Sequence, residues 1–350
     1  MRGSIRIVLF LAALTAAFAL LGQNSEPAAR EPEASPEQTI RVEVEEVIVP
    51  VTVTDDKGRF VSDLDAKDFR IFDEGRPQQI RFFTRDPQQP VVVGFLLDMS
   101  NSTRIHWKHF QEASMELAFN LLPGDDRFSG YLITFANDAE LAVNTTQDSE
   151  KIADKIRKLK PGGGAAFYDA IYMACTTRSL IQGEPYEPRR VIIVIGDGHD
   201  TASKKSLEEV LELAQRNLVT IYALSTVSFG FSSEGEKNLT RLAEETGGRV
   251  MYPLNNLYKD ISGYLSTPSD EGNFAIKVGT GGYAAEVASG IFRAIAAVSG
   301  EISTQYILRY VPDTGTSPDS KLFRKIEVKV PVLPHVRMRH RSGYYPSQPQ

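Results

Sequence analysis

The feature that most constrains the fold is a stretch without a single polar side chain at residues 91–97, Val-Val-Val-Gly-Phe-Leu-Leu. A strand of this kind is typical of a parallel sheet whose two faces are both covered by helices. Residues 191–195 form a second run, made only of β-branched aliphatic residues, and residues 219–224 form a third. We therefore expect these three segments to be buried strands of one sheet.

Segments with helical character separate these strands. The expected helices are residues 106–122, 149–159, 166–182, 204–216, 236–246 and 284–298. Shorter strands are expected at residues 130–135, 140–143 and 249–252. This alternation predicts an α/β fold with a doubly wound, mainly parallel sheet. We assign the sheet to residues 86–301, with an insertion at about residues 262–283.

The segments on either side of this domain, residues 40–85 and 302–345, have the alternating character of β-strands. In the first, residues 69–72 and 80–83 are expected to be short strands joined through residues 74–77. In the second, strands are expected at residues 305–310 and 323–330. Two or three short strands are marginal as a separate unit. We therefore expect the two segments to form one small β module beside the central domain.

The N-terminus has the layout of a secretory signal peptide. Arg2 and Arg6 precede an apolar run at residues 7–21, which ends abruptly at polar residues. The run is short for a bilayer span, which needs about 20 apolar residues, and this favours cleavage, after Ala19 or Gly22, over a membrane anchor. Residues 1–22 are thus the expected signal peptide and residues 23–39, rich in Pro and Glu, a disordered linker. We expect an exported, periplasmic or secreted protein whose only membrane contact is through the export signal.

Charge and cysteine content restrict the functional classes. The net charge of −6 and the lack of a basic stripe argue against a nucleic-acid-binding surface. Cys175 is the only cysteine, so the chain has no internal disulfide. Its place in an apolar helical segment favours a small buried residue over a reactive thiol.

Polar residues follow two of the buried strands directly. Asp98, Ser100 and Ser102 follow the first strand, and Asp197 follows the strand at residues 191–195. Ligands of open parallel sheets gather at the carboxyl ends of the strands, and hard oxygen ligands suit Mg²⁺, Mn²⁺ or Ca²⁺. An isolated Asp-x-Ser-x-Ser pattern is more often a turn or helix cap. The second aspartate at another strand end favours a metal site.

These motifs resemble the metal-ion-dependent adhesion site (MIDAS) of von Willebrand factor A (VWA) domains. The resemblance implies that Ser100 and Ser102 bind the metal directly, whereas Asp98 and Asp197 hold it largely through water. VWA domains also carry a threonine on a glycine-rich loop before a middle helix. The corresponding loop here is Gly-Gly-Gly-Ala-Ala-Phe-Tyr-Asp, so Ala165, which has no side-chain oxygen, takes the threonine position. This departure bears on the affinity for metal and not on the fold.

The resemblance extends to residues 51–55, 68–69, 305–306 and 343–345, which are similar to an exported acidobacterial-type VWA-related family with β segments around the domain. It implies a protein-binding or adhesion module in which an acidic residue of the partner completes the metal's coordination. The chain has no nucleophile–base arrangement, no Gly-x-Ser-x-Gly elbow and no His-Glu-x-x-His helix, so we do not expect an enzyme.

Two other functions stay open at this point. One is an accessory or substrate-positioning subunit of an envelope hydrolase or secretion system. The other is a binding scaffold that uses no metal. His199, two residues after Asp197, is interpreted as an ordinary loop histidine, although it could face the site. The sequence names neither the partner nor an oligomeric state.

Overall fold

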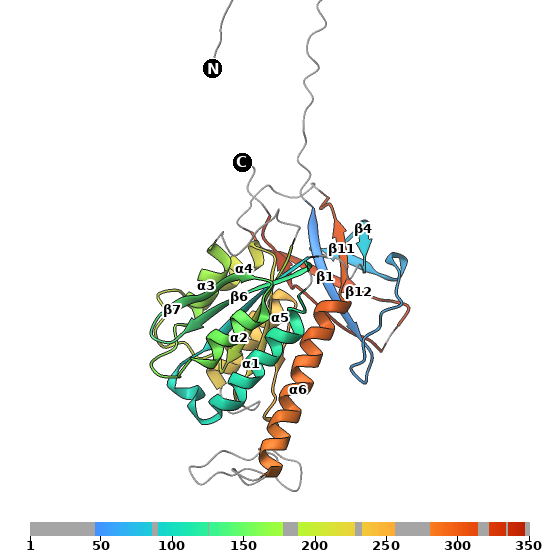
Figure 1. Cartoon of the computed structure of the whole chain (residues 1–350). Helices are drawn as coiled ribbons and strands as arrows, with labels where there is room; N and C mark the ends of the chain where they lie inside the picture. The colour runs from blue at the N-terminus through green and yellow to red at the C-terminus, as the bar shows by residue number, and fades with distance from the viewer. Residues whose placement is uncertain are drawn as a thin grey trace, which may run out of the picture. The chain divides into compact units, whose positions relative to one another are not determined.

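The central domain is built on a six-stranded sheet with the strand order β10-β9-β8-β5-β6-β7. Figure 1 shows this sheet with helices packed around it. The computed structural model describes residues 46–85, 90–124, 126–177, 188–227, 233–255, 281–313, 322–333 and 335–346. The strands of this sheet are β5 (Val91–Asp98), β6 (Phe128–Phe135), β7 (Ala139–Thr146), β8 (Arg189–Gly196), β9 (Val219–Ser225) and β10 (Val250–Met251). All neighbours are parallel except β7, which pairs antiparallel with β6. The predicted doubly wound, mainly parallel sheet is confirmed.

The pairing register of the strands shows which of them end at the same edge of the sheet. Every residue of β5 is buried, as its apolar sequence predicts. In the pairing of β5 with β6, Asp98 lies opposite Phe135, and in the pairing with β8, Leu97 lies opposite Ile195. The last residues of β5, β6 and β8 therefore share one edge. Asp98 and Asp197 consequently project from neighbouring strand ends.

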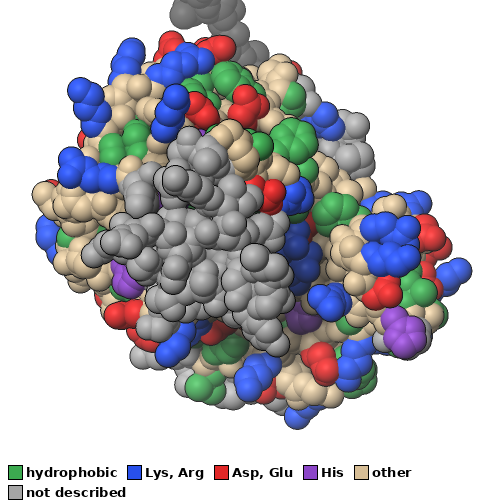
Figure 2. Space-filling model, turned by 90° about the horizontal axis from the view of Figure 1, so that it is seen from below, with side chains coloured by type: hydrophobic (Ala, Val, Ile, Leu, Met, Phe, Trp, Pro, Cys, Tyr) green, Lys and Arg blue, Asp and Glu red, His purple; other side chains and the backbone are tan. Residues whose placement is uncertain are grey.

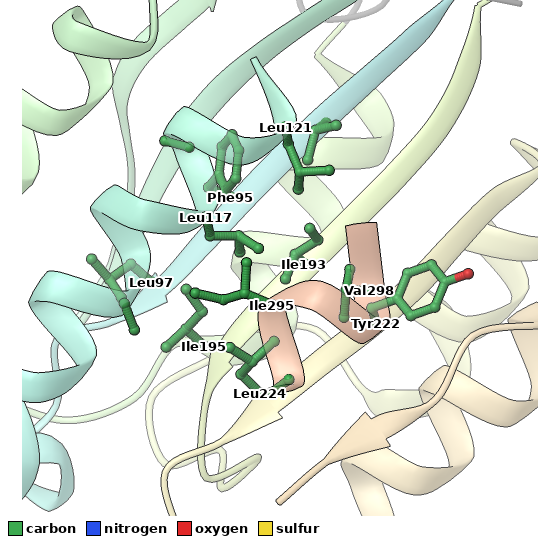
Figure 3. Close-up of a cluster of buried hydrophobic side chains, with 14 of the residues drawn as sticks. Phe95, Leu97, Leu117, Leu121, Ile193, Ile195, Tyr222, Leu224, Ile295 and Val298 are labelled. Atoms are coloured by element: carbon green, nitrogen blue, oxygen red, sulfur yellow. The ribbon is translucent and has the colours of Figure 1, made fainter. Parts of the chain in front are cut away.

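Helices cover both faces of the sheet. They are α1 (Trp107–Leu121), α2 (Ser149–Arg157), α3 (Phe167–Thr176), α4 (Leu207–Arg216), α5 (Ser233–Thr246) and α6 (Gly281–Thr304). The first, second and last pack on one face, where Leu117, Ile193 and Ile295 belong to one buried cluster (Figure 3). The helices α3, α4 and α5 contribute to the buried cluster on the opposite face. Alternate residues of β5 and β8 point to the two clusters, which explains their unbroken apolar sequence.

Several helix boundaries differ from those expected, and three of them bear on the argument. The segment after Asp98 first forms a 3-10 helix, η2 (Asn101–His106), and α1 begins only at Trp107. α5 begins at Ser233, before the expected start at residue 236. α6 runs from Gly281 to Thr304, so its first turn takes residues that the sequence assigns to the insertion. The two glycines at the start of this turn are poor helix formers and gave no helical signal in the sequence.

The flanking segments form two four-stranded antiparallel sheets, β13-β1-β11-β4 and β14-β12-β2-β3. Their strands are β1 (Val47–Thr54), β2 (Arg70–Asp73), β3 (Arg76–Gln78), β4 (Ile80–Thr84), β11 (Tyr306–Tyr310), β12 (Arg324–Lys329), β13 (Arg337–His340) and β14 (Gly343–Tyr344). β1 pairs with β11, and β2 pairs with β12, so each sheet combines both ends of the chain. The expected module made from N- and C-terminal segments is thus present.

One local expectation within this module is wrong. Residues 74–77 are not a simple connection between the strands at residues 69–72 and 80–83. The chain turns at Glu74 and Gly75, and β2 pairs with the additional strand β3. β4 instead pairs with β11 in the other sheet. Glu74 and Gly75 both have positive φ, of 50° and 75°, which closes a tight hairpin of only two residues. The strand β3, Arg-Pro-Gln, is too short and polar to be found from its pattern.

Buried polar side chains stabilise the module between its sheets. Asp73 is fully buried and accepts hydrogen bonds from the hydroxyl groups of Tyr310 and Tyr344, each at 3.0 Å. Arg324 donates to the other carboxylate oxygen at 2.9 Å. Because these partners come from β11, β12 and β14, one carboxylate connects strands of both sheets.

The described residues contain no helix that is long and apolar enough to cross a bilayer. The predicted signal peptide, the linker and residues 262–280 of the predicted insertion lie outside the described residues. On the face seen in Figure 2, acidic and basic side chains are interspersed around the atoms drawn in grey. Charges of both signs mixed in this way produce no broad single-sign field there.

Candidate metal centre

Asp98 is the buried carboxylate of the site. It is the last residue of β5 and is only 1% exposed. The backbone N–H of Ser100 donates to its Oδ1 at 2.8 Å. Its Oδ2 is also buried and has no hydrogen-bond partner among the residues that the structure describes. A Cβ at Gly196, the last residue of β8, would lie 2.9 Å from this oxygen, so the glycine gives the carboxylate its space.

The two predicted serines lie side by side after the strand. The Oγ atoms of Ser100 and Ser102 are 2.8 Å apart, within hydrogen-bond distance. Ser100 is buried and has extended backbone geometry as the residue before η2, whereas Ser102 is exposed on its first turn. The short 3-10 turn therefore brings two hydroxyl oxygens to one point beside Asp98.

Asp197 follows β8 directly and is 4% exposed. The backbone N–H of His199 donates to its Oδ1 at 3.0 Å, and the Nδ1 atom of the same residue lies 3.5 Å from that oxygen. His199 thus contacts Asp197, while its side chain is 43% exposed. Burial, and secondly the negative charge of Asp197, raise the pKa of Asp98 to about 7. The two carboxylates are therefore close enough to interact electrostatically.

A close backbone approach positions the Asp197 turn. Gly198 has φ of +81°, and a Cβ there would lie 2.2 Å from the carbonyl oxygen of Gly235 in α5. A Cβ at Gly235 would in turn lie 2.3 Å from the carbonyl oxygen of Asp197. Asn238 of α5 donates a side-chain hydrogen bond to the carbonyl of Gly198 at 3.2 Å. The first turns of α5 thus fix the aspartate, a role for Gly235 and Asn238 that the sequence did not reveal.

The glycine-rich loop with Ala165 closes a third side of the site. Gly162 N–H donates to the carbonyl of Met99 at 2.6 Å, and Asn101 N–H donates to the carbonyl of Gly163 at 3.1 Å. These bonds join the loop to the residues that flank Ser100. Ala165 itself is 3% exposed, and its side chain supplies a methyl group where the resemblance expects a hydroxyl.

The donor set is suited to a hard divalent cation. Among the described residues, no three His, Cys, Asp or Glu side chains are grouped for metal binding. That result agrees with the composition of this site, in which two of the four predicted ligands are serines. Two carboxylates, one of which has an unpaired buried oxygen, and two hydroxyl groups form an oxygen-rich environment of the kind that Mg²⁺ prefers. On these grounds the residues fit such an ion.

Comparison with known proteins identifies the domain. Residues 93–261 match the family model of the von Willebrand factor type A domain. The chain thus contains a VWA domain. Its central sheet, with polar residues at the ends of β5 and β8, is the part of the chain to which the match refers. The search of curated proteins gives no significant match.

Solved structures of other VWA-type proteins are similar to this chain. The conserved hypothetical protein BatB from Bacteroides thetaiotaomicron is 21% identical, with a TM-score of 0.36 over 61% of this chain and 97% of that one. An aerotolerance-related membrane protein from Bacteroides fragilis is 19% identical, with a TM-score of 0.38 over 59% and 98%. The proximal thread matrix protein 1 of the mussel byssus, described with a zinc-occupied MIDAS motif, is 20% identical, with a TM-score of 0.39 over 48% and 43%. This chain therefore spans less than half of the mussel protein.

Proposed function

We propose that this VWA-domain protein is an exported, non-enzymatic binding module that engages a protein partner through a divalent cation. The cation is Mg²⁺, Mn²⁺ or Ca²⁺, held by Asp98, Ser100, Ser102 and Asp197. The partner presents an acidic residue to it. VWA domains in general mediate protein–protein interaction, and the oxygen-rich group of side chains described above supports a metal-dependent form of this role.

The observation that carries the proposal is the unpaired Oδ2 of Asp98. Buried polar atoms are nearly always hydrogen-bonded, and an exception calls for an explanation such as an ion. This oxygen is buried, lies near a second carboxylate, and has no partner among the described residues. A cation or its bound water would satisfy it and would reduce the repulsion between Asp98 and Asp197.

The residues of the site have different roles in holding the cation. Ser100 and Ser102 hold neutral oxygens at one point, and the N–H groups of Ser100 and His199 each orient one carboxylate. When bound, a divalent cation supplies an open coordination position for a carboxylate of the partner. Exposure of Ser102 at the rim leaves that side accessible to a partner.

Binding to envelope or medium proteins tests the proposal. The full chain is used as bait with Mg²⁺ and with chelator, beside Asp98→Asn and the control Asp56→Asn, an exposed residue of the β1 turn. We expect capture of a partner that requires metal, is lost in Asp98→Asn and persists in the control. Titration calorimetry with Mn²⁺ is expected to show binding by the wild type and none by Asp98→Asn, with both proteins folded.

The second candidate is a binding scaffold that uses no metal, and Ala165 is the observation that favours it. A methyl group in place of a hydroxyl removes one direct oxygen from the site. Capture that is equal with and without chelator, together with no heat on Mn²⁺ titration, would support this scaffold and reject the metal-dependent proposal.

A further inference from the structure

A threonine from another loop lies against Ala165. The Oγ1 atom of Thr201 accepts a hydrogen bond from the backbone N–H of Ala165 at 2.9 Å. Thr201 is the fourth residue after Asp197 and belongs to the same loop. Thus the residue that lacks a hydroxyl in its own side chain is in direct contact with the hydroxyl of its neighbour.

The contact is one part of a double connection between the two loops. The backbone N–H groups of Thr201 and Ala202 both donate to the carbonyl of Ala165, at 2.9 and 3.1 Å. A Cβ on Gly164 would lie 3.1 Å from Thr201 Oγ1, so the glycine leaves room for this hydroxyl. The backbone of the loop that contains Ala165 therefore holds the Thr201 side chain in its position.

The loop that contacts Thr201 is also hydrogen-bonded to the residues on either side of Ser100. Asn137, in the turn after β6, accepts a hydrogen bond from Gly164 N–H at 2.7 Å. Bonds to Met99 and Asn101 connect the preceding glycines to the residues on either side of Ser100. The loops that carry Ser100, Ala165 and Asp197 thus form one hydrogen-bonded assembly.

A threonine hydroxyl has two lone pairs and one proton. The N–H of Ala165 uses one lone pair, so the second remains available as an oxygen donor. Thr201 is exposed, which leaves its hydroxyl accessible to an ion and its bound water. If Thr201 only held the loop in place, its hydroxyl would use the first lone pair and the second would have no role.

We propose that Thr201 supplies the third hydroxyl oxygen of the metal centre, in place of the oxygen that Ala165 lacks. This inference rests on the proposed metal-dependent function. It predicts that the two positions are alternatives: a hydroxyl at residue 165 or at residue 201 completes the site.

A double-mutant cycle on the full chain tests the inference. Mn²⁺ affinity is measured by calorimetry for the wild type, Thr201→Ser, Thr201→Val, Ala165→Thr and the double variant A165T/T201V. Thr201→Ser is expected to bind like the wild type, and Thr201→Val at least about tenfold more weakly, because a direct ligand should matter no less than the outer partners whose loss costs roughly tenfold or more. Ala165→Thr is expected to raise affinity more in the Thr201→Val background than in the wild type.

A second readout separates a ligand from a purely structural residue. With Tb³⁺ as probe, luminescence lifetimes in H₂O and D₂O give the number of bound waters, which Thr201→Val should raise by one and Thr201→Ser should not change. Thermal unfolding in chelator checks that all variants are folded. If the wild type binds metal and Thr201→Val binds it with equal affinity, this inference alone is overturned. The same holds if the effects of Ala165→Thr and Thr201→Val are additive and the number of bound waters is unchanged. No metal binding by the wild type would overturn the proposed function as well.

Discussion

Arg339 of β13 donates a hydrogen bond at 2.6 Å to Glu301, a residue of α6 that is fully buried. The same carboxylate oxygen is 2.5 Å from the Nε atom of Arg249, which precedes β10. Glu301 therefore links α6 to both the edge of the central sheet and the flanking module. Such a cluster is sensitive to the loss of Glu301, because Arg249 and Arg339 would remain partly buried without their counter-charge.

We expect Glu301→Ala to destabilise the protein by about 3–5 kcal/mol, since it leaves two arginines without their counter-charge. Glu286→Ala is the matched control on the same helix, because its ion pair with Arg293 at 3.2 Å is more exposed. The control is expected to cost at most about 1 kcal/mol. Urea unfolding of both variants provides the measurement, and equal effects would contradict a special role for Glu301.

A second prediction concerns the domain boundary. A fragment of residues 86–301 is expected to unfold at lower denaturant than the full chain, because the flanking module covers part of the domain. Arg341, for example, is buried and donates to the carbonyl of Gln215 at the end of α4 at 2.7 Å. Gln305 donates to the hydroxyl of Tyr222 at 3.1 Å. Equal stability of the fragment would show that the boundary predicted from the sequence marks an independent domain.

Acid is expected to weaken the fold through His106, which is buried, and His340, which is half-buried, whereas Asp98, whose pKa is raised, acts in the opposite sense. Burial, with a smaller effect of His109, lowers the pKa of His106 to about 4, and burial also lowers the pKa of His340. The Nε2 atom of His340 accepts a hydrogen bond from Val328 N–H at 3.3 Å, which requires the neutral ring. Below the unfolded pKa of about 6.5 the unfolded chain binds more protons than the folded one. The stabilisation is thus complete above pH 6.5 and decreases toward pH 4.

The measurement is denaturant unfolding at pH 7.5 and pH 5. We expect a loss of about 1–3 kcal/mol from these two groups. His106→Gln should reduce the pH dependence, whatever it does to stability at neutral pH. His335→Gln, at an exposed position, should leave the dependence unchanged. An unaltered slope in His106→Gln would contradict the assignment.

The sequence predicts those parts of this structure that depend on local patterns. The ends of the apolar runs at residues 91–97 and 191–195 located Asp98 and Asp197 at one sheet edge, because burial and chain direction determine that edge. β13 has the sequence Arg-Met-Arg-His and no alternation that would reveal it. It forms because β1 offers a free edge, with Val53 opposite Met338. Such pairing is a property of the tertiary structure.

The candidate site shows the same division. Asp98, Ser100 and Ser102 lie within five residues of each other, and their common turn follows from the strand end. Thr201 has no such signal, since it is one of several polar residues in a loop. Only its hydrogen bond to Ala165, 36 positions away, distinguishes it. Local patterns thus indicate the residues that begin a site, whereas contacts between loops indicate those that complete it.

The last prediction concerns the turn that carries Asp197. Gly198→Ala is expected to destabilise the protein by about 1–3 kcal/mol, because a side chain is strained at positive φ. It is also expected to weaken Mn²⁺ binding, because its Cβ would meet the Gly235 carbonyl and displace Asp197. Gly162→Ala is the control in another loop of the site. A Cβ there meets nothing within 4 Å.

The variants Gly198→Ala and Gly162→Ala are compared by two measurements, unfolding in chelator and calorimetric titration with Mn²⁺. The control should bind Mn²⁺ as the wild type does and keep its stability, since its backbone bond to Met99 involves no side chain. If Gly198→Ala lost stability but bound Mn²⁺ normally, Asp197 would not be required for the metal. The contact between α5 and the Asp197 turn would then serve the fold alone, and Asp98 and the serines would remain as the ligands to test.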